Sequence, residues 1–180
     1  MIVQLATINV NGLARRDKVT TLGQWMKKKR IQCLMLQEMY RGEGNIAQNI
    51  KSGYWSRGHW VIEGLVGLWI DNHWGRVVRS GGWDGRIVWA VCWVEGVGEL
   101  SMGSIYVPAE EKERKRWLER LEEWSETEEA EDWLNLDFLG GDFNMISRGE
   151  RDRSDRGKAV GWRAQEKGNG QWKAIAMKGG

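Results

Sequence analysis

Short apolar runs of strand length dominate the first 144 residues, and just two longer segments have the period of an amphipathic helix. The run 2–10 is rich in β-branched residues and ends in an Asn-Gly pair, which predicts a buried strand followed by a turn. A helix is predicted over 15–30, where apolar residues share one face and four cationic residues occupy the last turn. A second buried strand is predicted over 31–37, and a second helix over 110–133.

The segment between the two predicted helices indicates antiparallel pairing, because several short strand patterns follow one another with tight glycine or asparagine turns between them. These strands are predicted over 54–63, 65–70, 76–78, 86–94 and 99–107, and a last one over 135–139, broken by Gly140-Gly141. The order of strands and helices therefore predicts an α/β protein with mixed sheets and helices on the outside.

The length of 180 residues predicts a single domain with a core that needs no disulfide or metal. We expect this domain to span 1–154 and to be followed over 155–180 by a basic, glycine-containing tail that is poorly ordered.

No apolar run is long enough to cross a membrane, and no secretory signal begins the chain. Cys33 and Cys92 each lie within an apolar run, which suits buried free thiols in a reducing compartment.

Tryptophan is unusually frequent, with 13 residues against 2 phenylalanines. One interpretation is a surface that stacks on the bases of single-stranded nucleic acid. The other is that tryptophan fills the core in place of phenylalanine and leucine, which we favour because most of these residues lie inside strand or helix patterns.

Polar residues interrupt the apolar runs at four predicted strand ends, where α/β sheets often build their sites. These residues are Asn9 and Asn11, Glu38, Tyr106, and Asp142 with Asn144. Their carboxylate and amide oxygens would suit Mg²⁺ or Mn²⁺ and not zinc. Taken singly, each residue could equally belong to a turn, a strand terminus or the core. Neither His59 nor His73 is expected to be catalytic.

Four segments contain these residues in order: Thr7-Ile8-Asn9-Val10-Asn11-Gly12-Leu13, Leu36-Gln37-Glu38, Ser104-Ile105-Tyr106-Val107-Pro108 and Gly140-Gly141-Asp142-Phe143-Asn144. Read together, they resemble the motifs of the endonuclease/exonuclease/phosphatase family, and most of all the apurinic-type endonuclease domain of non-LTR retrotransposon reverse transcriptases. Asn11 is typical of the retrotransposon branch, since repair endonucleases usually have aspartate there. Asp152-Arg153-Ser154 also resembles that branch, so the resemblance covers 2–154.

The resemblance implies a DNase I-like, four-layer α/β sandwich and a phosphodiesterase that uses Mg²⁺ (or Mn²⁺) to nick DNA. It implies that Glu38 is the main metal ligand with Asn9 nearby, and that Asn11 belongs to the shell around metal and phosphate. Tyr106 would hydrogen-bond the scissile phosphate, Asp142 would orient or deprotonate the attacking water, and Asn144 would hold the phosphate or the transition state. The resemblance also implies that the protein is intracellular, and that it is nuclear if it acts as a retrotransposon endonuclease.

Two departures from the family pattern matter. Ala109 stands where the family often has asparagine, so one phosphate contact is expected to be missing. The family's closing Ser-Asp-His motif has no counterpart after His73, so we expect a C-terminally truncated copy that lacks the last strands of the second sheet and whose activity is impaired. The alternatives are a catalytically dead relic that at most binds nucleic acid, and a phosphatase of the same fold acting on another phosphoester.

Overall fold

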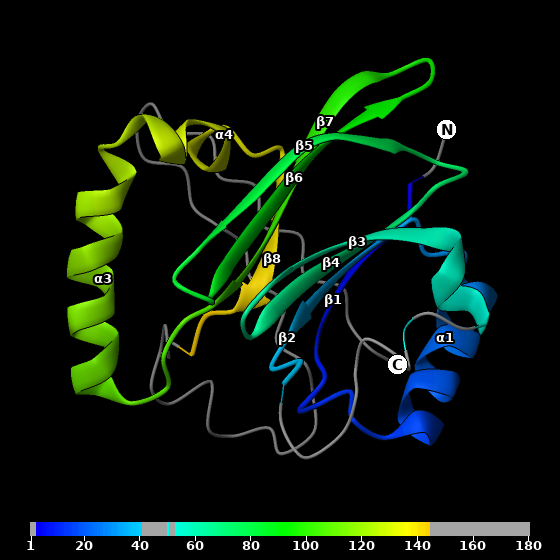
Figure 1. Cartoon of the computed structure of the whole chain (residues 1–180), viewed down its shortest axis with the longest axis horizontal. Coiled ribbons are helices and arrows are strands. Elements are labelled where there is room, and N and C mark those ends of the chain that lie inside the picture. Colours follow the sequence, from blue (N-terminus) through cyan, green and yellow to red (C-terminus); the bar gives the residue numbers. More distant parts are fainter. Residues whose placement is uncertain (1–2, 41–49, 51–52, 145–180) are drawn as a thin grey trace, which may run out of the picture.

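The computed structural model describes residues 3–40, 50 and 53–144 of the chain. Its strands form two four-stranded sheets that pack face to face between helices (Figure 1). Helix α1 covers the outer face of one sheet and helix α3 that of the other. The predicted DNase I-like sandwich of four layers is therefore confirmed, whereas the expected boundary at 154 and the basic tail over 155–180 lie outside the described residues.

The first sheet has the strand order β1-β2-β4-β3. Strand β1 (Leu5–Asn9) runs parallel to β2 (Cys33–Gln37), whereas β4 (Val66–Asp71) pairs antiparallel with both β2 and β3 (Gly58–Glu63). Every residue of β2 and β4 is buried, as expected for strands covered on both faces.

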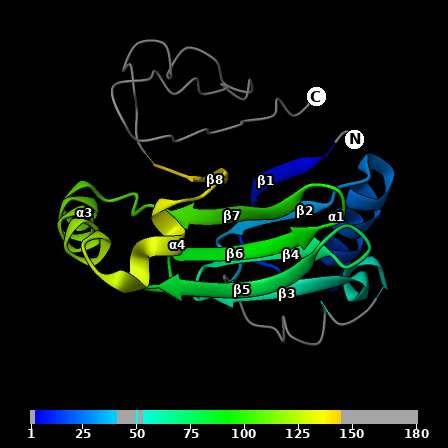
Figure 2. The ribbon, with the colours of Figure 1, turned by 90° about the horizontal axis from the view of Figure 1, so that it is seen from above.

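The second sheet has the order β5-β6-β7-β8. Strands β5 (Arg76–Trp83), β6 (Ile87–Val94) and β7 (Gly98–Tyr106) form an antiparallel meander, and β8 (Phe138–Asp142) adds parallel to β7. Figure 2 shows β8 and β1 side by side, each at the edge of its own sheet. Each sheet therefore contributes one parallel strand pair, and the edge strands of the two pairs are neighbours.

The helices close the outer faces. Helix α1 (Arg16–Lys29) follows β1, and the 3₁₀ turn η1 (Gly53–Arg57) packs against it. Helix α3 (Glu111–Ser125), the 3₁₀ turn η2 (Glu128–Ala130) and the short α4 (Glu131–Leu134) connect β7 to β8. None of the helices in the described part of the chain is long and apolar enough to cross a membrane.

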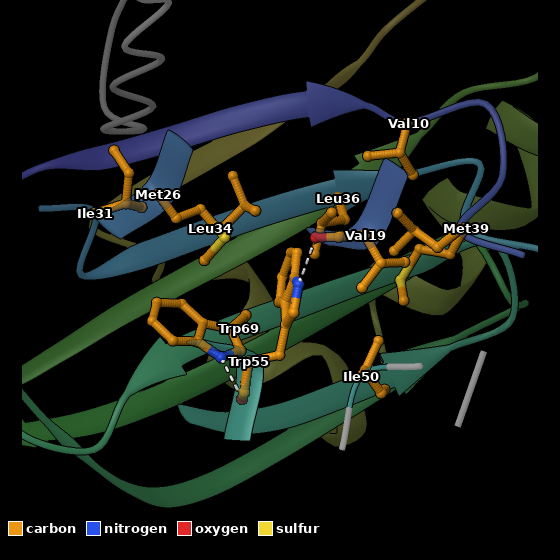
Figure 3. Close-up of a cluster of buried hydrophobic side chains, with 11 residues drawn as sticks. Val10, Val19, Met26, Ile31, Leu34, Leu36, Met39, Ile50, Trp55 and Trp69 are labelled. Carbon is orange, nitrogen blue, oxygen red and sulfur yellow. Dashed lines mark hydrogen bonds between the residues drawn. The ribbon is translucent and has the colours of Figure 1, made fainter. Parts of the chain in front are cut away.

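Three apolar clusters hold the four layers together, and tryptophan is prominent in the two outer ones. Beneath α1, the buried indoles of Trp55 and Trp69 donate hydrogen bonds to the carbonyls of Val19 and Trp55, at 2.9 and 3.0 Å (Figure 3). Further buried tryptophans lie between the second sheet and its helices, including Trp117, Trp124 and Trp133. These side chains are core residues, which confirms the packing interpretation for them. The middle cluster contains Cys33 and Cys92, both buried free thiols as predicted.

Three predicted elements were wrong in extent. Residues 54–57, predicted as strand, form most of η1. The helix predicted over 110–133 ends at Ser125, where the Thr127 hydroxyl and backbone N–H both donate to the carbonyl of Trp124 and close the last turn. The strand predicted over 76–78 continues to Trp83, because Gly81 lies under the ring of its cross-strand partner Trp89, where a Cβ would come within 2.5 Å of the ring.

The last strand was also misplaced: β8 runs through the glycine pair that was predicted to break it. A Cβ on Gly140 would lie 2.4 Å from Met35 Sδ and 2.9 Å from Thr7 Cβ, both in the opposite sheet. The two glycines therefore do not mark a loop. Gly140 lacks the side chain that would hold β8 away from β1 and β2, and so allows the two sheets to meet at this edge, whereas Gly141 lies against Ile105 of β7 in its own sheet.

Candidate functional site

The candidate site lies where the two parallel strand pairs end. In the first sheet Asn9 is in register with Gln37, and in the second Tyr106 is in register with Asp142. Because parallel strands present their carboxyl ends at one edge, each sheet places two loops there. The close packing of β8 on β1 then brings all four strand ends together.

Two hydrogen bonds join the sheets at this edge. Asn9 Nδ2 donates to Asp142 Oδ2 at 2.8 Å, which connects the end of β1 to the end of β8. The Tyr106 hydroxyl donates to Glu38 Oε1 at 2.8 Å, which connects β7 to the residue after β2. Glu38 and Tyr106 are buried, at 8% and 7% exposure, whereas Asn9 is exposed. The four side chains thus form two adjacent polar pairs, one buried and one open to solvent.

The remaining two predicted residues lie in the same loops. Asn11 donates its backbone N–H to Asn9 Oδ1 at 3.0 Å, and Asn144 donates its backbone N–H to Asp142 Oδ1 at 3.1 Å. The Asn144 side-chain amide donates to the carbonyl of Val107 at 2.7 Å, across to the loop that follows β7. All six residues selected from the sequence are therefore placed at one edge of the sandwich.

The backbone at this edge is strained. Asn11, Glu38 and Asn144 have φ angles of 43°, 54° and 46°, in the left-handed region. Asparagine tolerates this region, but glutamate rarely adopts it. Such conformations persist where the surrounding structure enforces them, and they concentrate at functional sites.

A buried polar network lies behind the site. Its only signal in the sequence is the presence of isolated polar residues within apolar strands. Gln37, 1% exposed, donates through Nε2 to Ser104 Oγ at 2.8 Å and to Thr7 Oγ1 at 3.1 Å. The fully buried Ser104 hydroxyl donates in turn to the carbonyl of Leu36 at 3.1 Å. These bonds join β1, β2 and β7 at positions one or two residues before the site residues of each strand, so they fix the spacing of the strand ends.

Two cationic side chains hold the loops, and sequence reasoning missed both. Lys18 from α1 donates to the carbonyls of Val10 and Asn11 in the loop after β1. Arg114 from α3 donates through Nη1 to the carbonyls of Pro108, Ala109 and Asn144, at 3.3, 2.9 and 3.2 Å. One guanidinium thus ties the loop after β7 to the loop after β8. Both residues resembled ordinary charged residues of a solvated helix face.

No histidine belongs to this edge, because both histidines of the chain lie at the opposite one. His59 at the start of β3 pairs with Ile70, and His73 follows the end of β4, whereas Glu38 adjoins the other end of the first sheet. The expectation that neither histidine serves the site therefore agrees with their positions. Ala109, where the motif resemblance led us to expect a missing phosphate contact, is exposed and offers no side-chain donor.

The donor set at the strand ends is all oxygen, from the carboxylates of Glu38 and Asp142 and the amides of Asn9 and Asn11. Elsewhere in the described residues, as here, no three Asp, Glu, His or Cys side chains gather closely enough to hold a metal by themselves. Mg²⁺ commonly binds through one or two carboxylates and keeps several waters, so this set fits Mg²⁺ and not a structural zinc ion.

Comparison with known proteins identifies the fold. No protein-family model matches the sequence, and no curated protein does. Among solved structures, an endonuclease/exonuclease/phosphatase family protein from Bacteroides thetaiotaomicron is 14% identical to this chain, with a TM-score of 0.53. The match covers 79% of this chain and 62% of that protein's chain. TDP2 from D. rerio, complexed with a single strand DNA product, is 16% identical to this chain, with a TM-score of 0.59. That match covers 81% of this chain and 62% of the TDP2 chain.

The endonuclease domain of TRAS1, a telomere-specific non-LTR retrotransposon, is 14% identical with a TM-score of 0.53, and the match covers 81% of this chain and 61% of that domain. The chain thus spans about three fifths of the length of these three structures. Both sheets, the flanking helices and these matches together show that the chain has the fold of the endonuclease/exonuclease/phosphatase family.

Proposed function

We propose that the chain is a metal-dependent phosphodiesterase domain that hydrolyses the backbone of DNA, as the resemblance of its motifs to retrotransposon endonucleases implies. The observation that carries the proposal is the joining of Glu38 with Tyr106 and of Asn9 with Asp142 at one edge of the sandwich. Two structural neighbours, TDP2 with its DNA product and the TRAS1 endonuclease domain, support DNA as the substrate class.

In this proposal Glu38 is the main metal ligand, with Asn9 and Asn11 nearby. A bound Mg²⁺ would supply positive charge against the oxygens of the reacting phosphate. Asp142 orients the attacking water and accepts its proton, and the bond from Asn9 Nδ2 fixes the direction of this carboxylate.

Tyr106 and Asn144 are the proposed donors to the phosphate. The Tyr106 hydroxyl has a single proton, with which it donates a hydrogen bond to Glu38 in this structure. To bind a phosphate oxygen, the hydroxyl must therefore rotate and donate to that oxygen instead. The Asn144 amide has two protons, and one bond to the Val107 carbonyl leaves the second for the phosphate. The Arg114 clamp and the buried Gln37 network hold these donors at a constant spacing.

We expect the activity of these 180 residues to be low, because both histidines lie at the opposite edge. Removing one preorganised donor from a transition state typically costs on the order of 10²–10³ in rate. The same observation favours the second candidate function, a relic that binds nucleic acid without hydrolysing it.

The test is relaxation of supercoiled plasmid by the purified chain with Mg²⁺, compared with Asp142→Ala and with Asp17→Asn. Asp17 is an exposed residue of α1 whose carboxylate pairs with Arg15, so Asp17→Asn controls for loss of one negative charge. Slow nicking that requires Mg²⁺, disappears in Asp142→Ala and persists in Asp17→Asn supports the proposal.

Equal nicking by all three proteins, or none by any, overturns hydrolysis at this site. Filter binding of the same DNA then decides the second candidate, because a relic that binds nucleic acid retains affinity without cleavage. A phosphatase of the same fold would instead release phosphate from a small phosphoester in the same three-protein comparison.

A further inference from the structure

A second pocket lies at the opposite edge of the first sheet. It has a volume of about 330 Å³ and is lined by residues from the end of α1, from η1, and from the turn after β4. Ile31 and Gln32, which precede β2, belong to its wall, whereas Glu38 follows the other end of the same strand. At about 3.3 Å per residue, β2 separates this pocket from the strand-end site by on the order of 15–20 Å.

The lining is rich in cationic side chains. Lys27, Arg30 and Arg57 converge on the pocket from two elements, together with the exposed His73. Asp71 is the one acidic side chain among the described residues of the lining. The volume is within the range of pockets that hold small ligands.

Asp71 offsets only one of the three cationic side chains, Lys27, Arg30 and Arg57, so the lining keeps a net positive charge. Oδ2 accepts from Arg57 Nη2 at 3.2 Å, and Oδ1 accepts from the backbone N–H of His73 at 2.9 Å. The carboxylate is buried, with 9% of its side chain exposed. The one acid of the lining is thus bonded within the protein, and two of the three cations have no carboxylate partner in the lining.

Arg57 is held in place before any ligand arrives. Its guanidinium lies over the ring of Tyr54, 5.0 Å from the centroid, and donates through Nη2 to Asp71. The Tyr54 ring is itself packed on the buried Trp69, with 5.4 Å between centroids. A guanidinium fixed in this way loses little side-chain entropy when it binds an anion.

A simpler explanation covers part of this arrangement. Cations in the last turn of a helix interact favourably with the helix dipole, and Lys27 and Arg30 are at the end of α1. That effect explains neither Arg57, which belongs to η1, nor its ion pair with Asp71, which also lines the pocket.

We propose that this pocket binds a phosphate group, with Lys27, Arg30 and Arg57 as its donors. The phosphate could belong to a free nucleotide or to the backbone of a nucleic-acid strand, since both present the same oxygens to these cations. Binding here is independent of hydrolysis at the strand ends.

The test follows the indole N–H signal of Trp74, which also lines the pocket, in the two-dimensional NMR spectrum of the ¹⁵N-labelled chain. The variant Trp74→Phe identifies this signal among the 13 tryptophans. Adenosine monophosphate, adenosine and a short single-stranded DNA are titrated separately. The variant Lys27→Gln/Arg30→Gln is compared with Lys115→Gln/Arg116→Gln, which removes the same charge from exposed positions of α3.

We expect adenosine monophosphate or the DNA strand to shift the Trp74 signal, adenosine to leave it unchanged, and the pocket variant to bind at least about tenfold more weakly than the α3 variant. Stronger response to the nucleotide assigns a free organic phosphate, and stronger response to the DNA assigns a backbone phosphate.

An equal response to adenosine, no response to either phosphate ligand, or equal weakening in both double variants overturns the proposal. If the pocket double variant does not give the dispersed spectrum of a folded chain, Arg30→Gln is compared with Arg116→Gln instead.

Discussion

Gly140→Ala is the substitution that most directly tests how the two sheets are brought together at the candidate site. Gly140 is a buried residue of β8 that faces β1 and β2. An added Cβ would lie 2.4 Å from Met35 Sδ, which can move because it belongs to a flexible side chain. It would also lie 2.9 Å from Thr7 Cβ, which cannot move without the backbone of β1.

The magnitude follows from that second contact. Ordinary contact begins at 3.4 Å, so β8 and β1 must separate by about 0.5 Å. Overpacking of this kind typically costs about 1–3 kcal/mol. For a chain of this size, each kcal/mol lowers the melting temperature by about 2–4 °C. The same movement pulls Asp142 away from Asn9, so we also expect weaker Mg²⁺-dependent nicking by the folded variant.

The assay is urea unfolding followed by circular dichroism, with Gly75→Ala as the matched control. Gly75 is also buried, but a Cβ there would meet its nearest neighbour, Val94 Cγ2, at an ordinary 3.4 Å. We expect the control to change the free energy of unfolding by less than about 1 kcal/mol. Equal stabilities for the wild type and Gly140→Ala, or equal losses for the two variants, would refute the account of β8.

Two further predictions concern buried polar groups. Burial raises the pKa of the Cys92 thiol to about 11 and also raises the pKa of Cys33, so both should resist a thiol reagent at about pH 8 until urea unfolds the chain. Once the chain is unfolded, these thiols ionise at about pH 8.5. The contribution of the buried neutral thiols to the free energy of unfolding is therefore fully present below that pH and should decline as pH rises from about 9 toward 11. Thermal melts across this range measure the decline, and an unchanged melting temperature would contradict it. Ser104→Ala removes a partner of the buried Gln37 amide and should cost about 1–3 kcal/mol in urea unfolding, whereas the exposed Ser56→Ala should cost less than about 0.5 kcal/mol; equal effects of the two substitutions would show that the network does not support the sheets.

The strand ends were predictable because they depend on local chemistry. A polar residue that ends an apolar run identifies the end of a buried strand, and this reasoning selected Asn9, Glu38 and Asp142 without any contact information. The order of the motifs then predicted the fold, and the two four-stranded sheets confirmed it. The roles assigned to these residues stay predictions.

The parts that sequence reasoning missed depend on contacts between distant segments. Gly140 resembles a turn residue until Thr7, more than a hundred positions away, is placed against it. Lys18 and Arg114 resemble solvated helix residues, because nothing in their neighbours shows that carbonyl groups of the site loops lie within reach. Turn and charge patterns are local signals, whereas close approach of two sheets is not.

Paramagnetic broadening by Mn²⁺ is the measurement that tests the central claim most directly, because it locates even a weakly bound ion. We predict that substoichiometric Mn²⁺ broadens the backbone amide signals of Gly12, Glu38 and Asp142 while sparing those near Asp71 at the opposite edge, and that excess Mg²⁺ restores them. Glu38→Gln should abolish the effect, whereas Glu99→Gln, which alters an exposed carboxylate on β7, should preserve it. Broadening that is uniform over the molecule, or that survives Glu38→Gln unchanged, would contradict the assignment of the strand ends as a metal and phosphate site.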